Sequence, residues 1–400
     1  MTLLIDPPNS QGHGRLWSHL ASDESFDELH RFAEGLGIPP RGFDRDHYDI
    51  PAERYERVVA AGATPVSSRE LIDRLRRAGL RRRKGQPLAP RKPGRTLARA
   101  ERLRVGDRVA VVAPAGPVTE SFDEGLEVLQ SWGLDVQVAK HVGGRHERFG
   151  YLAAGDAARA GDLMRAWCDP SVRAVFCARG GYGAQRIVDL LDWEAIAAAG
   201  TRALVGFSDV TALHQAFSAR VGMSSIHGPV VTSLGAGDNA SREHLRSMLF
   251  SPAPDTTITP VPARTLVGGR AEGVLVGGNV ALLAAGVGAE GSQPAADSIA
   301  VLEDVGEELY RLDRMLTQLL RSGWFDGVRG IALGQFTACG SPEQAGDLLL
   351  ERLGPLGVPM VGDVPVGHGD RNLAFPFGVP AALDADAGTL VLREPALLST

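Results

Sequence analysis

Residues 203–217 read Ala203-Leu-Val-Gly-Phe-Ser208-Asp209-Val-Thr-Ala-Leu-His-Gln-Ala-Phe217, and this stretch decides the fold class. The apolar run before Ser208 predicts a buried strand, and the apolar spacing over 210–217 predicts a helix packed on one face. A serine between a strand and a helix exposes its hydroxyl beside the free amides of the first helical turn. This pattern is typical of a nucleophile elbow. The alternative is that Ser208 only caps the helix, with Asp209 favoured by the helix dipole.

The chain before this stretch repeats the same strand–loop–helix order. We predict strands ending at Pro114 and spanning Leu134–Ala139 and Val172–Cys177, and helices over Ser121–Trp132, Gly155–Trp167 and Ala184–Leu191. This alternation predicts an α/β fold with a doubly wound parallel sheet. Because ligands bind at the carboxyl ends of such strands, the loops at Pro114–Gly116, Gly180–Gly181 and Ser208 should gather on one rim.

A glycine-rich loop, Ala178-Arg179-Gly180-Gly181-Tyr182-Gly183, follows one of these strands. The G-x-G-x-x-G spacing is absent, and no acidic residue stands at the distance expected of a ribose partner. We therefore predict no dinucleotide and no other cofactor. The backbone amides of Gly180 and Gly181 could still approach an anion. Arg179 is a candidate to bind a substrate carboxylate, with a structural salt bridge as the alternative.

Bulk composition narrows the classes of function. At 400 residues the chain should form two or three domains, and 44% apolar with 22% charged residues is typical of a globular protein. The net charge of −6 argues against nucleic acid as a main partner. The three cysteines, and the lack of a long apolar segment, favour a cytoplasmic protein without a membrane partner. None of the three lysines follows a serine at Ser-x-x-Lys spacing, so serine chemistry here needs a histidine as base.

Composition and periodicity divide the chain into five predicted segments. Residues 1–83 should form a small separate module, 84–102 a basic Pro-rich linker, 103–236 the domain carrying the nucleophile, 237–269 a loop-rich connection, and 270–400 a smaller C-terminal α/β domain. The C-terminal domain should contain a strand at Ile299–Asp304 and a helix at Leu309–Leu320.

The N-terminal module is rich in histidine and aspartate. The residues concerned are His13, His19, His30, His47, Asp6, Asp46 and Asp49. A metal or phosphoester site is one interpretation. The i, i+4 histidine pair of a helical zinc site is missing, however, and surface or capping histidines are the more common case. We therefore assign no metal ligands, and we leave open both the function of this module and whether its histidines bind metal.

Three residues could form a hydrolytic triad. A serine hydrolase needs a nucleophile, a neutral histidine and a carboxylate that orients the histidine. Glu303 ends an apolar strand, where a carboxylate needs a partner, and His368 lies in a Gly-flanked loop. The order Ser208, Glu303, His368 is that of α/β hydrolases. The alternatives are that Glu303 pairs with Arg311 or Arg314, and that His368 is part of an ordinary surface turn.

Eight segments carry a family resemblance. In chain order they are Gly106–Pro114, Ala178–Gly183, Val205–Asp209, His227–Leu234, Gly277–Asn279, Leu302–Asp304, Tyr310–Leu316 and Gly367–His368. With these segments, the chain from about Leu103 onward resembles the serine LD-carboxypeptidases of peptidase family S66, which include muramoyltetrapeptide carboxypeptidases and microcin immunity peptidases. The first hundred residues depart from that family and resemble a small bacterial domain of unknown function, from which no activity carries over.

The resemblance implies a mechanism and a fold. Ser208 would be the nucleophile, Glu303 the acid and His368 the base, with an oxyanion hole from the amides of Asp209 and Gly181. The fold would be a flavodoxin-like domain plus a smaller C-terminal domain, commonly dimeric, without metal. The implied substrate is a small peptide or muropeptide, cleaved at the L,D bond to a terminal D-alanine. An immunity-type peptidase or amidase acting on an aminoacyl-nucleotide, and a non-catalytic anion-binding protein, remain alternatives.

Overall fold

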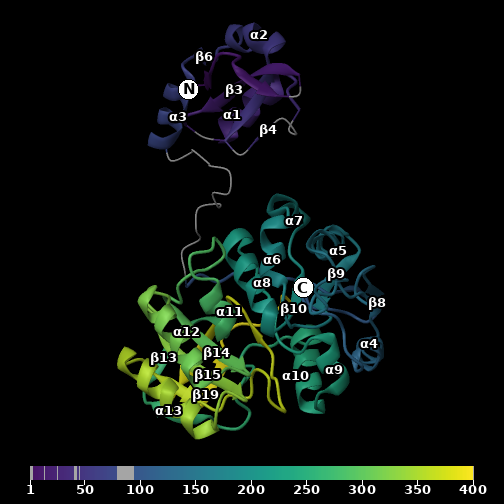
Figure 1. The fold of residues 1–400 in the computed structure, drawn as a ribbon, viewed down its shortest axis with the longest axis vertical. Helices are drawn as coiled ribbons and strands as arrows, with labels where there is room; N and C mark the ends of the chain where they lie inside the picture. The colour runs from purple at the N-terminus through teal and green to yellow at the C-terminus, as the bar shows by residue number, and fades with distance from the viewer. Residues whose placement is uncertain are drawn as a thin grey trace. The chain divides into compact units, whose positions relative to one another are not determined.

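The computed structural model describes residues 3–12, 14–24, 26–39, 43–44, 46–78 and 94–399. The chain divides into two compact units, which fall within residues 1–87 and 88–400 and are described separately here (Figure 1). Most of the expected linker, residues 84–93, lies outside the described residues, as does His13.

The described residues of the smaller unit form one mixed sheet and three α-helices. Its strands are β1 (Leu3–Ile5), β2 (Ser10–Gly12), β3 (Arg15–Ser22), β4 (Phe43–Asp44), β5 (His47–Pro51) and β6 (Thr64–Pro65), in the order β4-β5-β3-β1-β6 with β2 on β3. Its helices are α1 (Phe26–Gly35), α2 (Tyr55–Ala60) and α3 (Ser68–Arg77). At the start of α3, the Glu70 amide donates to the Ser67 hydroxyl at 3.1 Å.

The first sheet of the larger unit confirms the predicted fold class. Its parallel strands are β7 (Arg108–Val112), β8 (Asp135–Val138), β9 (Val172–Cys177), β10 (Ala203–Gly206) and β11 (Ile226–His227). Their order is β8-β7-β9-β10-β11, which is the 2-1-3-4-5 order of flavodoxin-like folds. Along β7, Val109 and Val111 face one hydrophobic core while Ala110 and Val112 face another. Both faces of the sheet are therefore covered, which explains the unbroken apolar runs in its strands.

Helices cover this sheet close to the predicted positions. They are α4 (Phe122–Ser131), α5 (Asp156–Cys168), α6 (Ala184–Ile187), α7 (Trp193–Ala199), α8 (Thr211–Ala216) and α9 (Val231–Ala236). A short π-helical turn, Phe217–Val221, continues α8. The predicted helix at 184–191 is α-helical only in its first half and continues as a 3₁₀ turn, Val188–Leu190.

The expectation of a loop-rich connection over 237–269 is wrong. Residues Asn239–Phe250 form the helix α10, and Arg264–Val267 form the strand β12. Asp238 caps α10 by accepting a hydrogen bond from the Ser241 amide at 2.9 Å. The helix buries Leu245, Met248 and Leu249 in the main core, so a short apolar stripe and a cap were enough to form it.

The second sheet of the larger unit is the α/β layer predicted for the C-terminal region, but with seven strands it is larger than the six-stranded first sheet. Its further strands are β13 (Arg270–Asn279), β14 (Ser298–Val305), β15 (Gly330–Thr337), β16 (Met360–Gly362), β18 (Pro380–Asp384) and β19 (Thr389–Leu392), in the order β12-β16-β15-β14-β13-β18-β19. The helices α11 (Val280–Ala285), α12 (Leu309–Arg321) and α13 (Pro342–Leu353) accompany it (Figure 1). One strand of this C-terminal region, β17 (Phe375–Pro376), pairs with β11 and so extends the first sheet.

Residues 94–102, assigned above to the linker, pack on the larger unit. The Leu97 amide donates to the Gly378 carbonyl at 2.9 Å, Ala98 forms a parallel bridge with Met223, and Arg99 pairs with Glu394 at 2.7 Å. These contacts place the end of the expected linker within the larger unit.

A buried carboxylate joins two strands of the second sheet to a helix. Asp304, at the end of β14, accepts from the Asn279 side chain at 3.0 Å and from the Ala281 amide at 2.9 Å. It thereby fixes the N-terminus of α11 next to the end of β13. Burial raises the pKa of Asp304 from its ordinary 3.8 to about 6, against the lowering effect of these hydrogen bonds.

This raised pKa predicts a pH dependence of stability. The folded chain binds the proton of Asp304 more tightly than the unfolded chain does, so protonation of Asp304 adds to the free energy of unfolding at low pH. This contribution is lost as the pH rises through about 6. Between pH 5 and pH 8 the free energy of unfolding should fall by about 1.4 kcal/mol more in the wild type than in Asp304→Asn. Denaturant titrations of the larger unit at both pH values measure this difference, and parallel pH profiles for the two chains would contradict it.

Candidate active site

The backbone at Ser208 is held in a conformation that serine rarely adopts. β10 ends at Gly206, and a 3₁₀ turn over Ser208–Val210 leads directly into α8. Ser208 has φ of 63°, in the left-handed region, which costs an L-residue about 1–2 kcal/mol. Among the described residues, none accepts or donates a hydrogen bond at its hydroxyl, so Ser208 does not act as a helix cap. A strained, half-buried serine at a strand-to-helix bend is the arrangement of a nucleophile elbow.

The glycine-rich loop lies directly against this elbow. A Cβ atom on Gly180 would lie 2.8 Å from the Ser208 Cβ and 3.0 Å from its Oγ, so only glycine fits there. The Gly180 carbonyl accepts a hydrogen bond from the Gly116 amide at 2.9 Å. The three loops expected to meet on one rim therefore do meet.

The Asp209 side chain ties the elbow to the glycine-rich loop. Its Oδ2 accepts from the Ala184 amide at 2.7 Å, at the first residue of α6. Burial raises the pKa of Asp209 from 3.8 to about 6, and the Ala184 amide, the Arg159 charge and the Gly183 amide each oppose that rise. The backbone amide of Asp209 is one of the two predicted oxyanion donors, and its side chain holds the neighbouring loop in place.

Sequence reasoning missed a buried arginine that clamps the same loops. The Arg159 side chain, on α5, donates to the carbonyls of Pro114 and Gly183, the latter at 2.8 Å, and to the Ala154 carbonyl at 3.0 Å. It also pairs with Asp156. A single guanidinium thus holds two of the rim loops together. No local pattern marks it, because its carbonyl partners come from three separate segments.

His368 and Glu303 are in direct contact. The Nδ1 of His368 is 2.6 Å from Oε2 of Glu303, which is completely buried at the end of β14. Burial alone raises the pKa of Glu303, but the imidazoles of His227 and His368 outweigh it and lower the pKa to about 2. A carboxylate here fixes the His368 proton on Nδ1 and leaves Nε2 available as an acceptor.

Neither arginine offered as an alternative partner pairs with Glu303. Arg311 donates from its Nε to the Tyr310 hydroxyl at 3.2 Å, and the Arg314 guanidinium lies 5.4 Å from the centre of the Tyr310 ring. Within the described part of the chain, the ion-pair partners of Glu303 are histidines.

The loop that carries His368 depends on a glycine. Gly367 has φ of 112°, and a Cβ atom there would lie 2.8 Å from both Cβ and Oε2 of Glu303. Its amide donates to the Asn372 side chain at 3.0 Å. Because the backbone passes so close to the carboxylate, the next residue, His368, can reach it.

Contacts between the two halves of the larger unit bring the elbow near this pair. The ring of Phe207, adjacent to Ser208, packs on the His368 ring with 4.7 Å between centroids. The backbone amide of Asn279, at the end of β13, donates to the Thr211 hydroxyl on α8 at 3.1 Å. Among the described residues, no hydrogen bond joins the Ser208 hydroxyl to His368.

His227 is a second histidine beside Glu303 that sequence reasoning did not single out. It is completely buried on β11, stacks on Phe375 with centroids 4.6 Å apart, and has its Nε2 3.9 Å from Oε1 of Glu303. This distance is too long for a hydrogen bond, and neither ring nitrogen has a partner among the described residues.

Two further predicted residues lie in the glycine-rich loop. Arg179 is half-buried and donates from Nη1 to the Pro117 carbonyl at 2.9 Å. In the described ranges it forms no salt bridge, and the other N–H groups of its guanidinium are not bonded to protein. The Gly181 amide likewise has no acceptor in the described part of the chain.

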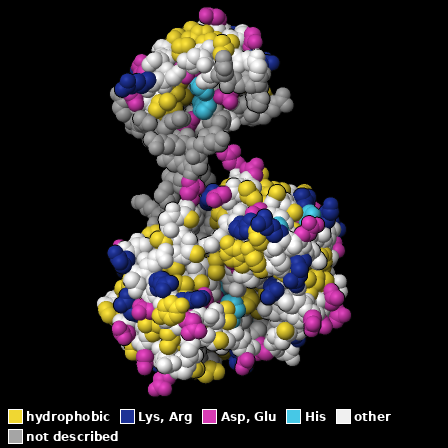
Figure 2. Space-filling view, in the orientation of Figure 1, with side chains coloured by type: hydrophobic (Ala, Val, Ile, Leu, Met, Phe, Trp, Pro, Cys, Tyr) yellow, Lys and Arg dark blue, Asp and Glu magenta, His cyan; other side chains and the backbone are white. Residues whose placement is uncertain are grey.

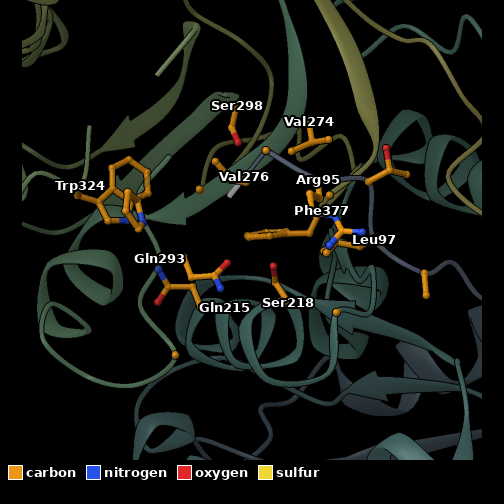
Figure 3. A pocket seen from close by; sticks show the side chains of 18 residues that line it. Arg95, Leu97, Gln215, Ser218, Val274, Val276, Gln293, Ser298, Trp324 and Phe377 are labelled. Atoms are coloured by element: carbon orange, nitrogen blue, oxygen red, sulfur yellow. The ribbon is translucent and has the colours of Figure 1, made fainter. Parts of the chain in front are cut away.

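A separate cavity of 280 Å³ lies elsewhere in the larger unit (Figure 3). Phe377, Ser218, Gln215 and Val274 are among its lining residues, and the segment 94–98 forms part of its wall. None of the predicted site residues lines it, so we do not assign it to the candidate active site.

Family comparisons agree with the resemblance predicted from the sequence. Residues 109–228 match the LD-carboxypeptidase N-terminal domain, residues 272–383 match the LD-carboxypeptidase C-terminal domain, and residues 3–78 match a protein of unknown function, DUF4031.

Comparisons with individual proteins support the same family. A putative carboxypeptidase of Streptomyces coelicolor is 56% identical over 308 residues, which cover 76% of this chain and 99% of that protein. The murein tetrapeptide carboxypeptidase of Pseudomonas aeruginosa is 38% identical over 294 residues, covering 70% and 94%. The structure of the microcin C7 self immunity protein MccF in complex with aspartyl sulfamoyl adenosine has a TM-score of 0.69 at 23% identity, covering 75% and 99%. The last likeness concerns the fold.

The strain at Ser208 predicts an unusual order of stability among variants. Ser208→Ala keeps a side chain at φ of 63°, whereas Ser208→Gly removes the penalty of the left-handed conformation. The glycine variant should therefore be the more stable of the two by about 1 kcal/mol. Thermal unfolding of both variants measures the difference. An alanine variant as stable as the glycine variant would show that the elbow is not strained.

Proposed function

Because this chain belongs to the LD-carboxypeptidase family, we propose that it hydrolyses the amide bond before a free carboxylate, with murein tetrapeptide as substrate and D-alanine as product. The observation that carries this proposal is the contact of His368 with the buried Glu303, beside a serine held at a strained bend. The murein tetrapeptide carboxypeptidase named above, 38% identical over most of both chains, supports the choice of substrate.

In the proposed mechanism, Ser208 attacks the carbonyl carbon of the scissile bond. The Nε2 of His368 takes the hydroxyl proton, while Nδ1–H donates to Glu303 and stabilises the resulting imidazolium. The amides of Asp209 and Gly181 stabilise the oxyanion, which is typically worth about 3 kcal/mol per donor. The C–N bond then breaks, and the imidazolium protonates the leaving amine. Water, deprotonated by the same imidazole, finally hydrolyses the acyl-enzyme.

The proposed substrate ends in a carboxylate that needs a cationic partner. Arg179 is our candidate, because it extends from the loop that touches Ser208 and, among the described residues, its guanidinium has a single contact to protein. A guanidinium binds a carboxylate through two parallel hydrogen bonds, which would also fix the orientation of the substrate.

A second candidate function is hydrolysis of an aminoacyl-nucleotide. The fold shared with a protein solved in complex with aspartyl sulfamoyl adenosine favours this alternative. It uses the same three residues and differs only in what the rim binds. The ratio of kcat/KM for murein tetrapeptide and for an aspartyl-nucleotide amide distinguishes the two. A third alternative, an anion-binding protein without catalysis, predicts no turnover of either compound.

The cytoplasmic location and the homodimer remain predictions. Among the described residues, no helix is both long and apolar enough to cross a membrane. The three cysteines are free thiols, which suits the proposed cytoplasmic location. A homodimer is proposed on the family resemblance alone, and sedimentation at micromolar concentration tests it.

The triad predicts a specific pattern of variant kinetics. Ser208→Ala should lower kcat for D-alanine release at least about 1,000-fold, and Glu303→Gln roughly 100- to 10,000-fold. The double variant should be no slower than Ser208→Ala alone, because the residues act as a unit. Release of D-alanine from murein tetrapeptide, followed by chromatography, measures these rates.

The matched control is Ser218→Ala, which removes a hydroxyl from the turn after α8 but lies in the separate cavity. It should retain nearly all activity. Turnover by Ser208→Ala equal to that of the wild type would exclude the serine mechanism.

A further inference from the structure

The smaller unit contains a cluster of side chains suited to a metal ion. His19 on β3 and His47 and Asp49 on β5 each offer one ligand atom, and these atoms lie within 4.8 Å of one another. All three side chains are partly exposed, so an ion could reach them from solvent. On the visible face of this unit, histidine atoms lie exposed beside acidic side chains (Figure 2).

Sheet register explains why residues so far apart in sequence meet. In the antiparallel pair β3·β5, His19 lies directly opposite Asp49. His47 is two residues from Asp49 on the same strand and therefore points to the same face of the sheet. The i, i+4 helical spacing considered above is thus unnecessary, because neighbouring strands supply the ligands instead.

A buried carboxylate orients each histidine. Nδ1 of His19 is 2.9 Å from Oδ2 of Asp6, and Nδ1 of His47 is 2.6 Å from Oδ1 of Asp46. Both aspartates are almost completely buried. The hydroxyl of Ser68 and the backbone amide of His19 also donate to Asp6, each at 2.6 Å. This arrangement leaves Nε2 of each imidazole as the ligand atom, as in the carboxylate–histidine–metal triads of known metal sites. The Nε2 of His19 lies 3.4 Å from the Ser10 hydroxyl and that of His47 pairs with Asp49, and a bound ion would replace both contacts.

The spacing of the ligand atoms already approaches that of a bound ion. Two ligands of a tetrahedral zinc ion, each about 2.1 Å from the metal, are roughly 3.4 Å apart. The Nε2 of His47 and Oδ1 of Asp49 are 3.3 Å apart. The two histidine rings are perpendicular with 4.7 Å between centroids. Only small side-chain movements would therefore be needed to bring the third ligand to the ion.

We propose that His19, His47 and Asp49 bind one divalent transition-metal ion of the zinc type. Transition-metal ions of this type bind well to a set of two imidazoles and one carboxylate, whereas magnesium and calcium prefer ligand sets made of oxygen atoms alone. Three protein ligands leave at least one coordination position open, which is typical of catalytic rather than structural sites. Of the three ligands, Asp49 also lines a cavity of 490 Å³, together with Trp17, Arg15 and Arg54. This inference is independent of the hydrolytic function proposed for the larger unit.

Zinc and cobalt binding to the full chain tests the proposal. The chain is expressed without a polyhistidine tag, stripped with a chelator and titrated with Zn²⁺ by calorimetry. The wild type should bind one more Zn²⁺ ion than the double variant His19→Ala/His47→Ala, with a micromolar or tighter Kd. Asp49→Asn should weaken binding 10- to 100-fold, and far-UV circular dichroism checks the folding of each variant. Co²⁺ should give visible absorption of a nitrogen- and oxygen-ligated site in the wild type, and Asp49→Asn should shift it.

His30→Ala is the matched control. His30 lies in the same unit, and its Nδ1 contacts the Tyr48 hydroxyl at 2.9 Å, outside the cluster. The control should keep wild-type stoichiometry. A wild-type chain that binds no Zn²⁺ at micromolar concentration overturns the proposal. Equal binding by the wild type and the double variant overturns it as well. If the double variant does not fold, an unchanged Co²⁺ spectrum in Asp49→Asn overturns it.

Discussion

The 2.6 Å contact between His368 and the buried carboxylate of Glu303 is the interaction on which the site depends. A carboxylate without solvent needs compensating partners: His368 contacts Oε2 of Glu303 directly, His227 lies 3.9 Å from Oε1, and together the two imidazoles keep the pKa of Glu303 low. The same contact fixes which nitrogen of His368 carries the proton. The backbone of Gly367 passes so close to Glu303 that a Cβ atom would not fit between them, so the histidine loop packs directly against β14.

The site lies where two sheets of the larger unit meet, and backbone packing decides its geometry. The strand β17 comes from the C-terminal region yet pairs with β11 of the first sheet. The Thr211 hydroxyl accepts from the amide at the end of β13, and the Phe207 ring packs on His368. These contacts couple the elbow to the Glu303–His368 pair. We therefore expect changes at this junction to alter positioning of the proposed nucleophile before they alter overall folding.

Much of the fold followed from the sequence, because alternating buried strands and amphipathic helices are local patterns. The elbow at Ser208 and the Glu303–His368 pair were also accessible, since unusual polar residues stood at strand ends and in Gly-flanked turns. The helix α10 was missed because its apolar stripe is short. Arg159 was missed, and the residues around His19 were noted but not assigned as metal ligands, for a different reason. Their partners come from distant segments, and only the register of neighbouring strands or the packing of loops brings them together.

The central claim is that Ser208 forms a covalent acyl intermediate with the assistance of the Glu303–His368 pair. Rapid quenching of the wild-type chain with murein tetrapeptide, followed by mass spectrometry of its peptides, tests this claim most directly. We expect a mass increase equal to the acyl part of the substrate on the peptide that contains Ser208. Release of D-alanine with no acyl group on that peptide, and no loss of release in Ser208→Ala, would contradict it.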